Sequence, residues 1–186
     1  MEIDVNQKKI SIGDKYNIFT NGVQTHFASK RMFQWLAEIK LFTGGGDIPV
    51  IIIKRRFAFF KAKYTITRAD GTVLPFITKS FWKRVYQCTG GNNIYTVYGH
   101  RGRKYSIFKN DVQVAWWSKS AVTWFNGDNY KILADNDCDA TLLIAFCLII
   151  DNYASNDEKN NNAVNVNVGS IGPQGKKFDA NWQPKI

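Results

Sequence analysis

The amino-acid sequence predicts a mainly β protein, an antiparallel closed barrel of about twelve strands that surrounds a central hydrophobic α-helix. Between residues 10 and 134, short segments with period-2 alternation and β-branched or aromatic residues follow one another. Glycine, asparagine and aspartate turns separate them, as in Asn21-Gly22 and Asp70-Gly71. Apolar residues 142–150 then break this period. With 186 residues, 45% of them hydrophobic, the chain is long enough for one domain with a substantial core.

Eleven segments have the pattern of strands, and their nearly regular spacing favours a barrel or a sandwich. The first eight or so residues precede this pattern and are expected to be frayed. The eleven segments are residues 16–20, 24–28, 33–42, 49–54, 57–68, 73–78, 84–88, 94–98, 104–109, 112–119 and 129–134.

The apolar run 142–150 predicts a helix, at about residues 139–153, that the sheet encloses. At ~100° per residue, nine consecutive apolar residues cover every face of a helix, so the helix has to be buried on all sides. A barrel of eight strands is filled by its own side chains, so a helix ~10 Å across requires about a dozen strands.

A cluster of acids precedes and begins the helix. Asp135, Asp137 and Asp139, with Asp128 nearby, lack the glycine and the distal glutamate of an EF-hand loop. We expect Asp137 and Asp139 to cap the helix, and a metal site is the less favoured alternative.

The barrel domain is expected to span residues 1–154. The polar run 155–162 predicts a linker, and residues 155–186 as a whole predict a polar linker and a loosely attached C-terminal tail. Alternating Val164, Val166 and Val168 add the option of one edge strand within this tail.

The cysteines and histidines argue against an enzyme or a metalloprotein. Cys88, Cys138 and Cys147 have no Cys-x-x-Cys spacing, so neither a disulfide framework nor a zinc site is indicated. His26 and His100 are far apart in the sequence, which disfavours a histidine metal site or a histidine-based catalytic group. We therefore predict no catalytic residues, no metal and no cofactor.

Positive charge is concentrated in the middle of the chain. The formal net charge is +10, and residues 54–109 hold 13 basic residues against one acid, Asp70. Aromatic residues alternate with these cations, either because aromatics face the core and charges face solvent, or because both form an anion-binding face. The candidate anion-binding residues lie at strand ends and in turns: Lys54, Arg55, Arg56, Lys83, Arg84, Arg101, Arg103 and Lys104.

Two classes of partner fit such a face. We expect anionic lipid headgroups or an acidic partner, and nucleic acid bound by the same basic and aromatic residues is the alternative. The pairs Phe81-Trp82 and Trp116-Trp117, if on strands, each leave at least one aromatic side chain exposed. The sequence has no apolar run of membrane-spanning length and no signal peptide at its start, so we expect a cytoplasmic protein with peripheral access to membranes.

Three stretches resemble the LURP-one-related family. They are a strand with Val114-Ala115, a strand with Asp128-Asn-Tyr130, and an Asp-led apolar helix that ends in Ile150-Asp151. The resemblance covers roughly residues 10–153. This family belongs with the tubby C-terminal domains and the phospholipid scramblases, so the resemblance implies a twelve-stranded barrel around a central hydrophobic helix.

The resemblance implies a non-enzymatic binding or scaffold module. Tubby domains bind phosphoinositide headgroups through basic residues and have been proposed to bind DNA, and scramblases act on membrane lipids. Scrambling is the least expected activity, because this chain lacks the cysteine-rich and proline-rich segments of scramblases.

Overall fold

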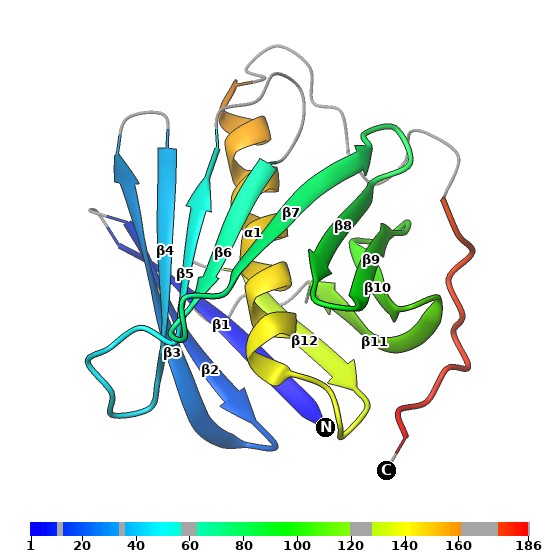
Figure 1. The fold of residues 1–186 in the computed structure, drawn as a ribbon, viewed down its shortest axis with the longest axis horizontal. Coiled ribbons are helices and arrows are strands. Elements are labelled where there is room, and N and C mark those ends of the chain that lie inside the picture. The colour runs from blue at the N-terminus through cyan, green and yellow to red at the C-terminus, as the bar shows by residue number, and fades with distance from the viewer. Residues whose placement is uncertain (11–12, 34–35, 57–62, 120–127, 161–174, 186) are drawn as a thin grey trace.

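The computed structural model describes residues 1–10, 13–33, 36–56, 63–119, 128–160 and 175–185. These residues form twelve strands and one helix, α1, which stands inside the ring of strands (Figure 1). The elements are β1 (Glu2–Ile10), β2 (Gly13–Thr20), β3 (Val23–Phe33), β4 (Leu36–Thr43), β5 (Ile51–Arg55), β6 (Lys63–Arg68), β7 (Val73–Ser80), β8 (Val85–Gly90), β9 (Asn93–Gly99), β10 (Lys104–Lys109), β11 (Val112–Lys119), β12 (Asn129–Ala134) and α1 (Ala140–Asn160).

The strands form a closed antiparallel barrel, which confirms the predicted fold class. Each strand pairs with its neighbours in the sequence, and β1 closes the ring against β12 as well as pairing with β2. The expectation of a frayed N-terminus was wrong. Ile3 and Val5 point inward and are fully buried, while Asp4 between them faces outward. The many polar residues of this strand made it hard to recognise from the sequence.

Helix α1 fills the barrel. Residues 142–150 are all buried, and the Phe146 ring lies 5.5 Å from that of Phe76 and 5.7 Å from that of Tyr95. Asp139 caps the helix as expected, because its Oδ1 accepts a hydrogen bond of 3.0 Å from the Leu142 backbone N–H. The other carboxylate oxygen of Asp139 lies 2.5 Å from the guanidinium of Arg68.

The helix runs seven residues further than expected. Residues 155–160, predicted to begin a linker, continue α1 as far as Asn160. This polar segment holds neither proline nor glycine, so nothing in it ends a helix. The division of the chain at residue 154 stays a prediction, and the edge strand around Val164 to Val168 lies outside the described residues.

The C-terminal segment 175–185 lies along the outer wall of the barrel beside β8 to β11 (Figure 1). The Phe178 ring sits 5.5 Å from Trp116 and 5.2 Å from His100, and the ammonium of Lys176 lies 3.7 Å from the centre of the Phe108 ring. At the end of the segment, the Lys185 N–H donates to Asp135 over 2.6 Å. The expectation of a loosely attached tail was therefore wrong for residues 175–185.

An aromatic outer face explains why the segment packs there. Outward-facing Tyr98, Phe108 and Trp116 would be open to water without a cover, and His100 beside them is only 1% exposed. Burying such side chains is favourable.

The two ends of the barrel differ in charge. Odd-numbered strands finish at the end with the β7–β8 and β9–β10 turns, which we call the cationic end. Even-numbered strands finish at the other end, where α1 begins, which we call the acidic end. The loops of the acidic end carry Asp47, Asp70, Asp111, Asp135, Asp137 and Asp139. In the described part of the chain, no helix has the length and hydropathy needed to span a membrane.

Candidate anion-binding site

Two of the three predicted basic groups meet at the cationic end. The β7–β8 turn carries Lys83 and Arg84, the β9–β10 turn carries Arg101 and Arg103, and Lys104 is the first residue of β10. We call these five residues the twin-turn cluster. Their convergence follows from the topology, because alternate turns of an antiparallel barrel lie at the same end and β8 pairs directly with β9.

Arg84 joins the two turns. Its guanidinium donates a hydrogen bond to the His100 carbonyl and lies 5.8 Å from the centre of the Tyr105 ring, and its own carbonyl accepts from the Gly99 N–H over 2.9 Å. Arg84 adopts a left-handed backbone conformation, with φ of 49°, a region that disfavours residues with a Cβ. The contacts of Arg84 therefore hold the two turns together.

The exposed cations of the cluster are available to a partner. Lys83, Arg101 and Arg103 are exposed, and none of them forms an ion pair with any residue that the structure describes. Lys104 is half-buried, and its ammonium lies 5.0 Å from the centre of the Phe178 ring. Three cations therefore face solvent from two turns that are fixed relative to each other.

The third predicted group, on β5, does not join the cluster. One strand separates β5 from β7 and two separate it from β8, so at ~4.8 Å per strand the third group is about 10–14 Å from the β7–β8 turn along the wall. Lys54 forms a 3.4 Å ion pair with Glu38, and Arg56 donates a 2.9 Å hydrogen bond to Thr65. Arg55 alternates with Lys54 and so faces the barrel interior.

The aromatic pair Phe81-Trp82 lies at the tip of the β7–β8 turn. The strand placement considered for this pair was wrong, since both residues belong to the turn and both are exposed, Phe81 at 42% and Trp82 at 72%. Their rings form an edge-to-face pair with centroids 5.6 Å apart. By contrast, Trp117 is fully buried against Tyr105, and Trp116 is half-covered by Phe178.

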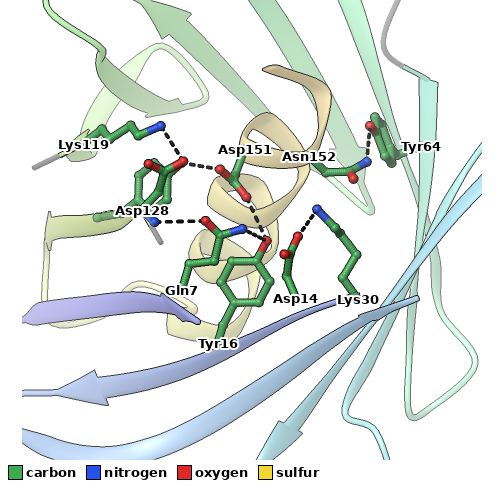
Figure 2. Close-up of polar contacts among 10 residues, drawn as sticks. Gln7, Asp14, Tyr16, Lys30, Tyr64, Lys119, Asp128, Asp151 and Asn152 are labelled. Carbon is green, nitrogen blue, oxygen red and sulfur yellow. Dashed lines mark hydrogen bonds and ion pairs between the residues drawn. The ribbon is translucent and has the colours of Figure 1, made fainter. Parts of the chain in front are cut away.

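A second polar group lies inside the cationic end, around the last buried turn of α1 (Figure 2). Asp151 accepts hydrogen bonds from the hydroxyls of Tyr16, over 2.8 Å, and Tyr130. Gln7 connects Tyr16 to the Asp128 backbone N–H, with hydrogen bonds of 3.3 Å and 3.0 Å. The sequence analysis marked Asp151 only as the end of the helix and missed its tyrosine partners, which come from strands far apart in the sequence.

Ion pairs and an amide surround this inner group. Lys119 pairs with Asp128 at 2.5 Å, Lys30 pairs with Asp14, and Asn152 donates to the Tyr64 hydroxyl over 2.8 Å (Figure 2). These contacts join β11 to the residue before β12, β2 to β3, and α1 to β6. The arrangement is typical of a satisfied structural network that fixes the helix in the barrel.

Burial controls the proton affinities of the interior groups. Loss of hydration raises the pKa of the Asp151 carboxyl above 3.8, although the two tyrosine hydroxyls oppose that rise. Desolvation and the nearby Asp151 carboxylate likewise raise the pKa of Tyr16. The inner polar group is therefore sensitive to pH mainly through Asp151.

Burial changes the proton affinities of two cysteines and of one histidine. Burial raises the pKa of the Cys88 thiol to about 12 and that of Cys138 to about 11, which keeps both protonated at neutral pH. Desolvation lowers the pKa of His26. Among the described residues, no group of three or more histidine, cysteine, aspartate or glutamate side chains has an arrangement that suits a metal ion.

Comparison with known proteins gives one result, and it covers the barrel. A family model described as LURP-one-related matches residues 1–151. Searches of curated proteins and of solved structures found no match. The matched range ends at Asp151, the residue that receives the two tyrosine hydroxyls.

Proposed function

The chain belongs to the LURP-one-related family, and we propose that it is a non-enzymatic binding module that contacts anionic lipid headgroups at a membrane surface. The contact is made by the twin-turn cluster. Its barrel, closed around a central helix, is consistent with the tubby C-terminal-like fold.

The observation that supports this function is the presence of three exposed cations, Lys83, Arg101 and Arg103, on two joined turns. A Lys or Arg close to an anionic membrane contributes about 1 kcal/mol, so three acting together give a useful attraction. The acids at the opposite end of the barrel strengthen the preference for one orientation, because an anionic surface attracts the cationic end and repels the acidic end.

Vesicle flotation tests the proposal. We expect the protein to float with phosphatidylcholine vesicles that contain phosphatidylserine or a phosphoinositide, and to remain behind with phosphatidylcholine alone. Binding should weaken as salt is raised, because the Debye length falls to about 3 Å at 1 M. Reversal of Arg101 and Arg103 to Glu should weaken binding at low salt while leaving the melting temperature unchanged, since exposed charges add little to stability.

The matched control reverses two cations at the acidic end, Lys109 and Lys185, and so changes the net charge by the same amount. Equal weakening by both double variants would show that net charge alone drives binding and would refute a localised site. A salt-titrated gel shift with DNA and RNA completes the comparison. Tight nucleic-acid binding that depends on Arg101 and Arg103, without vesicle binding, would contradict the lipid proposal in favour of the nucleic-acid alternative.

A further inference from the structure

We propose that the Phe81-Trp82 turn is a membrane anchor whose rings enter the interfacial layer of the bilayer while the neighbouring cations hold the headgroups. This inference rests on the proposed function and names its partner more narrowly, as an assembled anionic bilayer rather than a free headgroup.

The turn presents its aromatic rings outward on a fixed backbone. Trp82 is 72% exposed and Phe81 42%, although burial is favourable for both side chain types. The Arg84 N–H closes the turn on the Phe81 carbonyl over 3.0 Å, and the Lys83 N–H reaches the Ser80 hydroxyl at 3.4 Å. The edge-to-face contact between the two rings keeps them together as one apolar tip.

The location of this tip identifies the partner. Other large exposed apolar residues, including Val23, Ile48, Val73 and Val112, are aliphatic and lie in or beside turns at the acidic end, which an anionic surface repels. Phe81 and Trp82 instead adjoin Lys83 and Arg84, and Arg84 ties them to the turn that carries Arg101.

Tryptophan is the residue type that prefers the membrane–water interface, because its ring is apolar while its indole N–H needs a polar partner. The short reach of the turn favours interfacial entry rather than deep insertion. Cations that contact headgroups and an aromatic tip among the upper acyl chains would lie side by side in such a complex.

The test combines Trp82→Ala and Phe81→Ala in one variant and measures its affinity for phosphatidylcholine vesicles that contain a phosphoinositide. We expect binding about tenfold weaker than that of the wild type, a difference of roughly 1.4 kcal/mol. Binding of the soluble inositol phosphate headgroup should be unchanged. The matched control replaces Ile48 and Val112 with Ala at the acidic end, and this variant should bind vesicles as the wild type does.

A second readout reports insertion directly. Vesicles with brominated acyl chains should quench part of the protein's tryptophan fluorescence, and Trp82→Phe should remove that quenching while retaining most of the affinity. Unchanged vesicle affinity of the double variant, or an equal loss for the soluble headgroup, would overturn the anchor. If wild-type protein fails to bind anionic vesicles at all, the proposed function itself fails, so the two failures are distinguishable.

Discussion

Tyr16, on β2, donates its hydroxyl to Asp151, which lies 135 residues later in the chain on α1, over 2.8 Å. Tyr130 donates to the other oxygen of the same carboxylate from β12. Because β2 and β12 flank β1, the two tyrosines hold the last buried turn of the helix to one sector of the wall. The apolar residues 142–150 provide the burial, and this polar contact fixes the depth and rotation of the helix.

Asp151 predicts a specific dependence of stability on pH. A carboxyl whose pKa is raised in the folded state binds its proton more tightly there than in the unfolded chain. Its contribution is therefore fully present below the unfolded value of about 4 and is lost as pH rises through the folded pKa. Asp151→Asn has no carboxyl to titrate and so should not lose stability in this way. As pH rises above 4, the free energy of unfolding of the variant should therefore increase relative to that of the wild type.

Urea titrations at several pH values measure this difference. Asp137→Asn, a change at an exposed acid of the acidic end, is the control and should follow the wild-type profile. A pH-independent difference between Asp151→Asn and the wild type would show that the carboxyl has no shifted proton affinity.

Placing a charge on the buried helix should abolish folding. Ile144 is fully buried in the middle of α1, so Ile144→Asp leaves a carboxylate without a partner in an apolar core. We expect a loss of more than ~4 kcal/mol, enough to prevent the recovery of soluble protein. Val112→Asp, at a position 54% exposed, is the control and should fold normally. A stable soluble Ile144→Asp variant would contradict the enclosed helix.

Removing the Arg84 side chain should loosen the twin-turn cluster. Arg84→Ala deletes the hydrogen bond to the His100 carbonyl and keeps a Cβ in the left-handed conformation, so we expect a loss of about 1–2 kcal/mol. Arg84→Gly should be the more stable of the two variants, because glycine adopts this conformation without strain. Chemical denaturation checks the order, and Arg101→Ala should have no effect on stability. Equal stability of wild type and Arg84→Ala would refute the joining role.

The C-terminal segment should detach when its aromatic contact is removed. Phe178→Ala deletes the ring that lies between His100 and Trp116, and we expect faster hydrogen exchange and proteolysis within residues 175–185. The strands should stay paired, with a stability loss of roughly 1–2 kcal/mol for a half-buried phenylalanine. Asp179→Ala, at an exposed neighbour, is the control. Unchanged protection in Phe178→Ala would show that the ring does not hold the segment.

Local pattern was enough to predict the barrel and its helix. The nine apolar residues 142–150 can be buried only if the helix is enclosed on all sides, and turn residues such as Asn21-Gly22 and Asp70-Gly71 mark real strand boundaries. The boundary between β3 and β4 was misplaced, because the predicted break at residues 29–32 lies within β3. The first strand was missed because Ile3 and Val5 are the only apolar residues that alternate with polar ones there, and the polar residues 6–9 follow them. The packing of residues 175–185 was missed because it depends on Trp116 and Phe108. The sequence alone does not reveal that these two strand residues face outward.

The candidate site was predicted only in part. Turn positions could be recognised for Lys83 and Arg101, whereas their meeting depends on which turns share an end of the barrel. Nothing in the sequence assigns Arg84 to the His100 carbonyl or Lys54 to Glu38, because side-chain partners across strands depend on register. Asp151 was visible as the end of a motif, but its partners Tyr16 and Tyr130 lie 114 residues apart in the sequence, and only the closure of the barrel brings them together.

Because the barrel closes through pairing of β1 with β12, it cannot close during synthesis until almost all of its residues have been made. The first strand emerges from the ribosome well before its second partner, and the helix that fills the interior is made later than every strand. At about 5–20 residues per second, the inward faces of all twelve strands are made before their core, and those of the earliest strands wait for several seconds. The nascent chain therefore exposes more hydrophobic surface than the folded protein. Its yield in cells should depend on chaperones that cover the early strands until residues 142–150 have been synthesised.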